Sequence, residues 1–468
     1  MDILTTIAAL CFLMFVAYRG FSVILFAPVA ALLAVVWVSP SLVLPFFSGI
    51  YMEKLVGFLK PYFPVFLLGA IFGKLIDMSG FAKVITGRVV GLLGKNNAIL
   101  AVVVVCALLT YGGVSLFVAA FAVYPFAVEL FRAADIPRRL IPGTLALGSF
   151  TFTMDALPGS PQIQNIIPTT FFHTTTWAAP KLGLLGALFV MALGMAYLTF
   201  RRRQAASRGE GYGEVESTPK PAAAATSSDD SLATALLAVV PLLLVGVLNR
   251  WFTLLLPRIY AQSFDFSKVG VTGTAALDTS KLVAIWAVEG ALLVGILSVV
   301  CLAFRRVSRG FAIGANTAIA GAMLAALNTA SEYGFGGVIA ALPGFRLIST
   351  AMASAIHDPL LSEAITTTVL AGITGSASGG MSIALATMGP TYLERATQLG
   401  IPAEVLHRVA AMASGGMDTL PHNGAVITVL AVTGLTHRQS YADIFAMTLI
   451  KTAAVFVVIA FFYLTHLY

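Results

Sequence analysis

FTMDALPGSPQIQN, residues 152–165, interrupts one apolar segment of the chain, and SGGMDTLPHNG, residues 414–424, interrupts another. Both contain the pattern Asp-x-Leu-Pro, at 155–158 and at 418–421, so the same polar break occurs twice. Proline breaks a helix, and lipid offers no hydrogen-bond partner to the backbone groups that a break leaves free. The two breaks therefore predict a membrane protein in which non-helical backbone lies inside the protein.

The composition excludes a soluble protein. Of the 468 residues, 58% are hydrophobic and 10% are charged, and the mean hydropathy is +0.92. Soluble domains carry roughly 25% charged residues. Because one span takes about 20 apolar residues, roughly ten to twelve transmembrane helices fit the chain.

Charge and cysteine content exclude two further classes of partner. The net charge is +7, but the 28 Lys and Arg residues form short clusters between apolar runs and no basic domain, so nucleic acid is not expected as a partner. Cys11, Cys106 and Cys301 each lie singly in an apolar run. We therefore expect neither a metal site nor a cofactor.

The interruptions belong to an internal repeat. Four landmarks, counting the Asp-x-Leu-Pro breaks as one, occur in the same order in both halves of the chain, which predicts a duplicated unit. The other three pair GGVS at 112–115 with GGMS at 379–382, DIP at 135–137 with GIP at 400–402, and GF at 80–81 with GF at 334–335.

The sequence predicts an all-α polytopic membrane protein in three parts. Each repeat should hold about five transmembrane helices, one re-entrant hairpin and one broken helix. The connecting linker is made of Arg, Gly, Glu, Ser, Pro, Ala and Asp, which is typical of a flexible solvated segment. The parts are the first repeat at 1–200, with its hairpin at about 98–131 and its broken helix at about 140–172, the linker at 201–231, and the second repeat at 232–468, with its hairpin at about 359–393 and its broken helix at about 403–435.

The orientation follows from counting crossings and charges. Five crossings separate the two hairpins, and because five is odd the hairpins must enter from opposite faces, which makes the repeats inverted. The arginine clusters at 201–203 and 305–309 fall on the same face as the linker. Since cytoplasmic loops are enriched in Lys and Arg, we expect the linker to be cytoplasmic and the protein to lie in the bacterial inner membrane, in contact with lipid.

Inverted repeats with interrupted helices are typical of secondary transporters. The N-terminus of a half-helix presents free NH groups and a positive dipole end, which favour an anion. The pattern therefore predicts transport of a small organic anion.

The predicted substrate site combines hairpin tips with helix breaks. Glycines at the tips allow close backbone approach, and hydroxyl groups can donate to a carboxylate. Small residues that only permit tight helix packing are the alternative interpretation. The residues assigned to the tips are Tyr111, Gly112, Gly113, Ser115, Ser376, Ser378, Gly379, Gly380 and Ser382, and those assigned to the breaks are Ser160, Gln162, Asn165, Thr419, His422 and Asn423.

Asp155 and Asp418 are the candidates for the coupling ion, because a charge at membrane depth is costly and is usually functional. Each could carry a proton when neutral or bind sodium when ionised. His422, one helical turn beyond Asp418, could share its proton, which favours Asp418 of the two. The alternative is a carboxylate that only caps its own half-helix. Secondary candidates are Glu332 with Lys74, Glu363, and His357 with Asp358.

The strings around these residues resemble a known family. YGGVSLF from Tyr111, FTMDALPGSPQIQN from Phe152, TGSASGG from Thr374 and SGGMDTLPHNG from Ser414 are similar to a divergent branch of the gluconate permease family, which includes hydroxybutyrate permeases. The similarity covers nearly the whole chain outside the linker and the loop at 250–280.

The resemblance implies proton-coupled uptake of a hydroxy or sugar acid such as 3-hydroxybutyrate or gluconate. Through the wider ion transporter superfamily, it also implies a homodimer that works by an elevator motion. Typical gluconate permeases carry a histidine- and proline-rich string at the first break, where this chain has Asp155 and Ser160. That departure makes a shorter hydroxy acid or another organic anion an equal candidate for the substrate.

Two other functions fit part of the pattern. A sodium-coupled carboxylate symporter would use the carbonyl and hydroxyl groups of the tips as cation ligands. A membrane-embedded aspartyl hydrolase would use Asp155 and Asp418 as a dyad. The duplicated hairpin argues against the hydrolase, since such an enzyme needs no second hairpin, and we expect a transporter rather than an enzyme.

Overall fold

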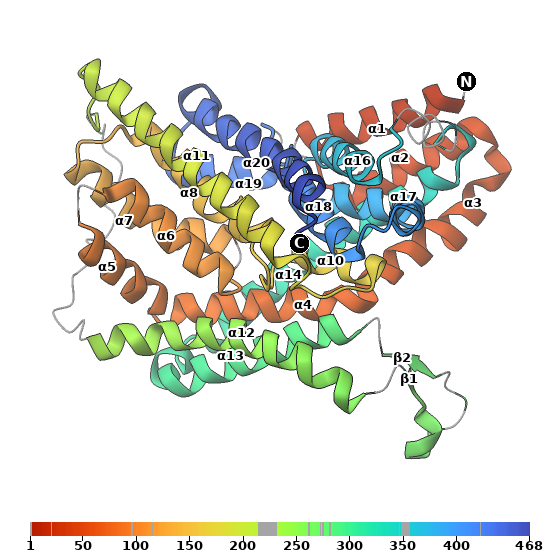
Figure 1. Cartoon of the computed structure of the whole chain (residues 1–468), viewed down its shortest axis with the longest axis horizontal. Coiled ribbons are helices and arrows are strands. Elements are labelled where there is room, and N and C mark those ends of the chain that lie inside the picture. Colours follow the sequence, from red (N-terminus) through yellow and green to blue (C-terminus); the bar gives the residue numbers. More distant parts are fainter. Residues whose placement is uncertain are drawn as a thin grey trace.

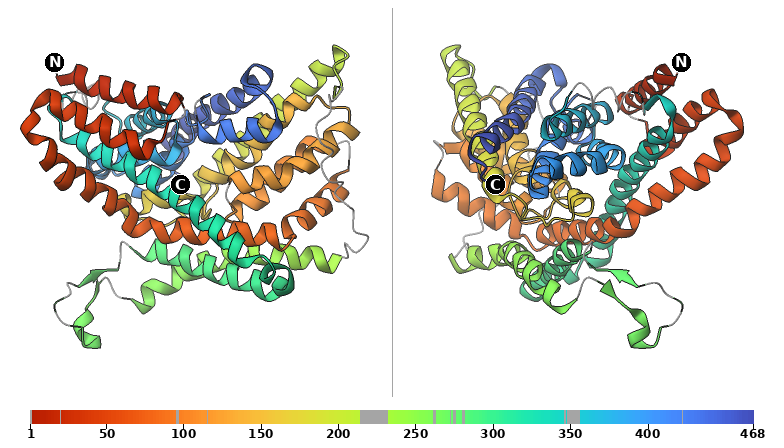
Figure 2. Two further views of the ribbon diagram at one scale, coloured as in Figure 1. Left: turned by 180° about the vertical axis from the view of Figure 1, so that it is seen from behind. Right: turned by 45° about the vertical axis from the view of Figure 1, so that its right-hand side comes forward.

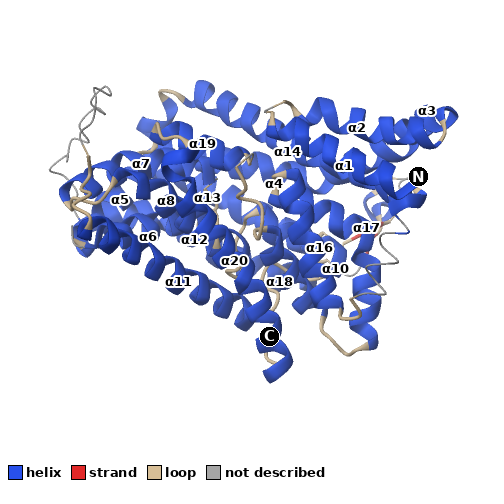
Figure 3. Ribbon diagram, turned by 90° about the horizontal axis from the view of Figure 1, so that it is seen from above, coloured by secondary structure: helices blue, strands red, loops and turns tan. Residues whose placement is uncertain are grey.

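Helices make up nearly all of the regular structure (Figure 3). The computed structural model describes residues 2–19, 21–94, 97–114, 116–213, 232–260, 263–271, 273, 276–279, 282–345, 347, 356–421 and 423–468.

The first half contains long helices, a hairpin and a broken helix (Figure 1). Its elements are α1 (Asp2–Tyr18), α2 (Val23–Val38), η1 (Pro40–Leu42), α3 (Val43–Phe46), η2 (Phe47–Tyr51), α4 (Met52–Met78), α5 (Phe81–Leu93), α6 (Ala98–Tyr111), α7 (Leu116–Ala133), η4 (Arg138–Leu140), α8 (Ile141–Ser149), α9 (Phe152–Asp155), α10 (Ile163–Phe172) and α11 (Pro180–Ser207).

The second half has the same order of helix types and adds a two-stranded antiparallel sheet. Its elements are α12 (Leu232–Ile259), β1 (Ser263–Phe264), η5 (Phe266–Val269), β2 (Leu277–Asp278), α13 (Val283–Ser308), α14 (Phe311–Ala341), α16 (Pro359–Thr374), α17 (Ala377–Gln398), α18 (Ala403–Ser414), α19 (Gly424–Thr433) and α20 (His437–Thr465).

Among the described residues, six helices are long and apolar enough to cross a membrane: Pro40–Met78, Pro180–Ser207, Thr234–Ile259, Val283–Ser308, Phe311–Ala341 and His437–Thr465. Their outer faces carry large apolar side chains, such as Ile313, which is 79% exposed. Water would disfavour such a surface, and lipid accepts it. The all-α polytopic fold class is therefore confirmed.

One helical segment runs well beyond its most apolar stretch. Residues 61–78 are only the end of a segment that starts at Pro40. The earlier part of this segment carries Glu53, Lys54 and Lys60, which lower its hydropathy without breaking the helix. Hydropathy therefore locates the apolar part of a helix, and it misses the turns that carry charged side chains.

The two hairpins differ from the predicted alignment. In the first, α6 ends at Tyr111 and the turn uses Gly113 at φ +96°. In the second, α16 ends at Thr374 and the turn uses Gly375 at φ +65°. Counted from the last helical residues, Tyr111 and Thr374, Gly112 corresponds to Gly375. The predicted match of Gly112 with Gly379 was wrong.

Gly379 and Gly380 lie in the first turn of α17 and serve helix packing. A Cβ atom at Gly380 would collide with the backbone of Ala371 on α16. A Cβ atom at Gly379 would collide with the carboxylate of Glu332 on α14. The glycine pair allows three helices to approach closely, which sequence alone does not distinguish from a glycine required by its φ angle.

The landmark at Gly334 was also misplaced. Gly334 lies inside α14, whereas Gly80 is a left-handed residue between α4 and α5. The better match is Gly344 and Phe345, which follow α14 as Gly80 and Phe81 follow α4. All landmarks then share an offset of 263 to 265 residues, and Asp135 and Gly400, which match at the third landmark, both have positive φ.

Helices of the two halves pack reciprocally. α2 packs against α14 and α13 against α4, while α10 packs against α17 and α19 against α7. α12 and α13 lie side by side, and α13 packs against α4 (Figures 1 and 2). In the same way, α1 and α2 lie side by side, and α2 packs against α14. If α13 is taken as the equivalent of α2 and α14 as the equivalent of α4, the contact of α2 with α14 corresponds to the contact of α13 with α4. Such an exchange between halves is the pattern of an internal two-fold axis.

Candidate functional site

The two helix breaks meet near the centre of the helical core. The first follows α9, which ends at Asp155, and the second follows α18, which ends at Ser414. Gly415 begins the second break directly against the Asp155 carboxylate, where a Cβ atom would collide with Oδ2. Residues far apart in sequence are therefore in contact at this point.

Lys451 of α20 joins the second break to the link between α8 and α9. Its Nζ forms an ion pair with Asp418 and donates a 3.1 Å hydrogen bond to the carbonyl oxygen of Phe150. Lys451 and Asp418 are both buried. Lys451 is not among the predicted site residues, although a lysine within an apolar helix is itself a signal of a buried partner.

Arg408 is a second buried cation that sequence analysis missed. It lies on α18 and is 0% exposed. Its guanidinium donates to the backbone oxygen of Asp155 at 3.2 Å, to Asn165 Oδ1 at 3.1 Å and to the Ala178 oxygen at 2.8 Å. An arginine this deeply buried needs several acceptors, and two of them are backbone oxygens, at Asp155, where the first break begins, and at Ala178, between α10 and α11.

The Asp155 side chain is 3% exposed, and its Oδ2 has no hydrogen-bond partner among the described residues. Lys451, Asp418 and Arg408 all lie within electrostatic range of it. The site therefore contains two carboxylates and two cations, of which Asp418 and Lys451 are paired directly.

Each hairpin tip is fastened to the break of its own half. Gln162 Nε2 donates to the carbonyl oxygen of Thr110 at 2.7 Å. Asn423 Nδ2 donates to the carbonyl oxygen of Gly375 at 2.6 Å, while its Oδ1 caps the start of α19. These two predicted residues thus donate to carbonyl groups at the C-terminal ends of α6 and α16, and the Thr110 oxygen also accepts from the Gly113 NH at 3.1 Å.

Other residues predicted at the first break are used within the protein. Ser160 donates to the Thr153 oxygen at 2.9 Å. Asn165 donates to the backbone of Ser160 and Thr176 and accepts from Arg408 and from His407 Nε2, the latter at 3.2 Å. They shape the break and position Arg408.

At the first tip, Tyr111 donates to the Pro158 oxygen at 2.9 Å. Tyr111 and Gly112 also line an apolar cavity of about 420 Å³ against α12, and Tyr111 lies within electrostatic range of Arg408. Gly113 faces Pro161, Leu292 and Phe72.

At the second tip, Ser376 caps α17 by accepting from the Gly379 NH at 3.1 Å, and Ser378 lies 3.2 Å from Thr329. The Ser382 hydroxyl is buried and has no hydrogen-bond partner among the described residues. At the second break, Thr419 and Thr448 hydroxyls are 2.5 Å apart. Ser115 and His422 lie outside the described residues.

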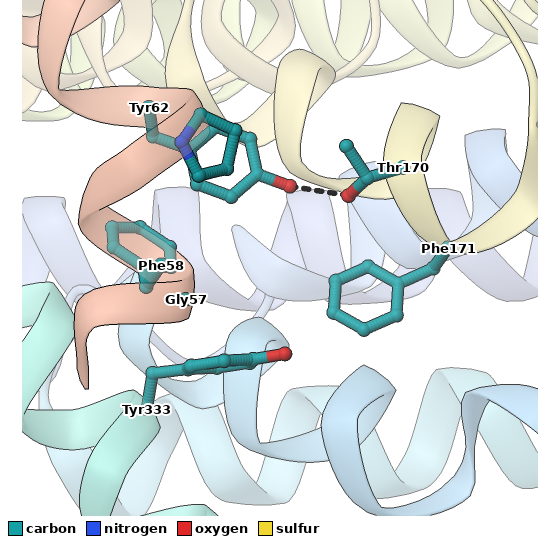
Figure 4. Close-up of a pocket in the computed structure, with 7 residues that line it drawn as sticks. Gly57, Phe58, Tyr62, Thr170, Phe171 and Tyr333 are labelled. Carbon is teal, nitrogen blue, oxygen red and sulfur yellow. Dashed lines mark hydrogen bonds between the residues drawn. The ribbon is translucent and has the colours of Figure 1, made fainter. Parts of the chain in front are cut away.

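A polar cavity of about 240 Å³ lies between α4, α10 and α14 (Figure 4). Tyr62 donates to the Ile167 oxygen at 3.1 Å and is hydrogen-bonded to Thr170. Thr170 lies five residues beyond Asn165 on α10, which corresponds to about 7.5 Å along a helix. The cavity is thus close to the Arg408 network along one helix. Its lining is Gly57, Phe58, Pro61, Tyr62, Thr170, Phe171 and Tyr333.

The chain is 59% identical over 471 residues to YxjC of Bacillus subtilis (strain 168), which is named an uncharacterized transporter, and the alignment covers 100% of both proteins. The chain belongs to this transporter family. No family model matches the sequence. Among solved structures, the YdaH transporter of Alcanivorax borkumensis is similar at a TM-score of 0.47 and 14% identity, covering 87% of this chain and 86% of that one.

Membership of a transporter family, together with the long apolar helices, makes this transporter an integral membrane protein and is in line with a non-enzymatic function. The geometry also disfavours the aspartyl hydrolase. Asp418 is paired with Lys451, whereas a hydrolytic dyad requires two carboxyl groups that share one proton.

Proposed function

We propose that the protein is a secondary active transporter that imports a small organic anion together with protons. The observation that carries the proposal is the meeting of two helix breaks at Asp155, Asp418, Lys451 and Arg408, inside the helical core of a membrane protein. Charged groups at such depth are costly and are retained for transport of ions or charged substrates.

The substrate class is a hydroxy or sugar acid, such as 3-hydroxybutyrate or gluconate. Two buried cations favour a carboxylate, and α17 and α19 both begin near the breaks with their positive dipole ends. The polar cavity beside Tyr62 and Tyr333 offers phenol hydroxyls to substrate hydroxyl groups. With this substrate class, we assign the protein to the divergent branch of the gluconate permease family.

Asp155 is the proposed proton carrier. Its Oδ2 has no hydrogen-bond partner among the described residues, whereas Asp418 is held in an ion pair by Lys451. Proton binding at Asp155 would neutralise a buried charge, so that proton and anion could cross together at a lower electrostatic cost. This assignment replaces Asp418, which the sequence favoured because of its neighbour His422.

The proposed mechanism is an elevator motion in a homodimer of the bacterial inner membrane, with inverted repeats and the 201–231 linker in the cytoplasm. The reciprocal packing of α2 with α14 and of α13 with α4 supports two related halves. The hairpins and broken helices, which are fastened to each other, would move as one body.

Sodium coupling is the second candidate. It rests on the carbonyl and hydroxyl groups of the hairpin tips, and two of those carbonyls, at Thr110 and Gly375, already accept hydrogen bonds from Gln162 and Asn423. A sodium ion at the tips would have to share these two oxygens or use the other carbonyl and hydroxyl groups there.

The test is uptake into proteoliposomes that contain the purified protein. Radiolabelled 3-hydroxybutyrate, gluconate and shorter or longer hydroxy acids are offered under an imposed proton gradient, an imposed sodium gradient or neither. The proposal expects accumulation of at least one of these acids driven by the proton gradient. Accumulation driven only by sodium would replace the coupling ion, and no uptake of any anion would refute the proposed function.

A further inference from the structure

Glu363 lies in the second turn of α16 and is 0% exposed. Within the described residues, neither of its carboxylate oxygens has a hydrogen-bond partner and no cation forms an ion pair with it. An ionised carboxylate in this state would be strongly destabilising, because burial removes its water and nothing replaces it. The described protein leaves this charge uncompensated.

Three hydroxyl groups on the same helix share this condition. Ser362, Thr366 and Thr367 are buried, and their hydroxyl oxygens also lack hydrogen-bond partners within the described residues. In a helix, Thr366 and Thr367 are the i+3 and i+4 neighbours of Glu363, and Thr366 is the i+4 neighbour of Ser362. Five buried oxygen atoms without partners thus form one polar face near the start of α16.

Tyr392 of α17 closes this face. Its phenol lies within electrostatic range of Glu363. Tyr392 is itself buried, and its hydroxyl is 3.4 Å from the sulfur of Met388. The polar face of α16 is therefore enclosed by the partner helix of the same hairpin.

The matching face of the first hairpin is apolar. We align α6 with α16 by their last residues, Tyr111 and Thr374. The four α6 positions equivalent to the polar face of α16 carry only hydrocarbon side chains. A hairpin of this kind therefore packs without these polar groups, so their presence in the second hairpin needs another reason. The α6 residues equivalent to Ser362, Glu363, Thr366 and Thr367 are Ile99, Leu100, Val103 and Val104.

We propose that Glu363, with the hydroxyl groups of Ser362, Thr366 and Thr367, binds one monovalent alkali cation. Carboxylate and hydroxyl oxygens are the ligands of hard cations. One carboxylate neutralises one positive charge, so a divalent ion would leave net charge buried in the protein. The inference goes beyond the proposed function, since cation binding at this place requires no substrate and does not involve Asp155.

The test measures the melting temperature of the full-length protein in detergent, without substrate, at a fixed alkaline pH. Sodium, potassium and lithium chloride are titrated against N-methyl-D-glucamine chloride at constant ionic strength, so that only specific binding raises stability. At least one alkali cation should give a saturable rise in melting temperature. If none raises it above the level in N-methyl-D-glucamine, the proposal is refuted.

Variants locate the binding site. Glu363→Gln and Thr367→Val should each shift the midpoint of the cation titration by roughly tenfold or more, the order expected when a group that holds a cation is changed. Thr367→Val keeps the shape of the side chain, so it remains informative if Glu363→Gln fails to fold. Glu394→Gln, an exposed acid on α17 of the same hairpin, is the matched control and should leave the midpoint unchanged.

Three further outcomes decide between this site and others. If both variants bind the cation as tightly as the wild-type protein, the cation occupies another site and the inference is wrong. If Asp155→Asn abolishes the stabilisation while Thr367→Val keeps it, the central carboxylate is the cation site instead. A melting temperature that depends on pH alone would assign a proton to Glu363. Because no substrate is present, none of these results depends on the outcome of the uptake experiment.

Discussion

Asn423 donates a hydrogen bond to the carbonyl oxygen of Gly375 and at the same time caps the first turn of α19. Gln162 donates to the carbonyl oxygen of Thr110 in the other half. Different side chains thus meet the same need, because the last carbonyl groups of a hairpin helix require donors that lipid does not provide. The tip of each hairpin is thereby tied to a helix break.

Asn423→Asp should reduce uptake by about tenfold or more with a small loss of melting temperature. Aspartate keeps the oxygen that caps α19, but it cannot donate to Gly375, and the unsatisfied carbonyl and new charge would loosen the tip. Initial uptake rates in proteoliposomes and melting curves in detergent measure the two effects. Asn97→Asp is the control, since Asn97 makes a similar bond to the Leu93 carbonyl on the exposed surface. Unchanged uptake by the Asn423 variant would contradict a role for the tie.

Lys451→Met should destabilise the protein by about 3–5 kcal/mol, because it leaves the buried Asp418 carboxylate without its partner. The double variant Lys451→Met/Asp418→Asn removes both charges and should recover much of that loss. Unfolding in denaturant, followed for the wild type, both single variants and the double variant, gives the coupling free energy. Additive effects of the two substitutions would show that the pair does not contribute to stability.

Asp155→Asn should preserve exchange of external for internal substrate and abolish accumulation driven by a pH gradient. Asparagine keeps the shape of the side chain but cannot bind and release a proton, and exchange does not require that release. Counterflow and gradient-driven uptake in the same proteoliposomes separate the two activities. Asp418→Asn serves as the comparison. Wild-type accumulation by the Asp155 variant would exclude this carboxyl group as the proton carrier.

Gly380→Ala should disrupt the second hairpin, because the added methyl group meets the Ala371 backbone, which cannot move aside as a flexible side chain would. Gly389→Ala on the same helix is the control, since its nearest neighbours are side-chain atoms at 3.6 and 3.9 Å. Melting temperature and the yield of monodisperse protein measure the difference. Equal stability of the two variants would contradict the close packing described for α16 and α17.

The surface pair of Glu210 and Arg139 should contribute to stability at neutral pH and lose that contribution in acid. Hydrogen bonding to Arg139 holds the pKa of Glu210 below its ordinary value of 4.5. A lowered pKa means that the contribution is present above the ordinary value and disappears as the pH falls through the folded-state value. The melting temperature of the wild type should therefore exceed that of Glu210→Gln at pH 7, and the difference should shrink below about pH 4.5.

The control for this comparison is Glu404→Gln, an exposed acid of α18, which should follow the wild type across the whole range. A difference between wild type and Glu210→Gln that grows as the pH falls would have the wrong sign for this ion pair.

Composition and pattern were sufficient to predict the fold class, because apolar spans and prolines in polar breaks obey strong constraints in lipid. Asp155 and Asp418 were visible for the same reason. Lys451 and Arg408 were passed over, although each is a charge inside an apolar segment. What the sequence lacked was the tertiary contact that brings α18 and α20 to the first break.

The misaligned glycines show a second limit of sequence reasoning. Gly375 is required by its positive φ, and Gly380 is required by a neighbouring backbone. Both requirements produce the same letter in the sequence, so matching glycine pairs by eye selected Gly379 and Gly380 as the tip. Only the contacts in three dimensions separate the two causes.

The reciprocal packing also governs how the protein can be synthesised. α2 and α4 belong to the beginning of the chain, yet both pack against α14, which begins more than 230 residues after α4 ends. At roughly 5–20 residues per second, translation leaves these N-terminal helices waiting in the membrane for tens of seconds before their partner is made. During that interval the faces that α14 will cover are open to lipid, to chaperones and to other nascent chains. Biogenesis of this protein is therefore a problem of delayed assembly, in which the first half must be kept from pairing wrongly until the second half has been inserted.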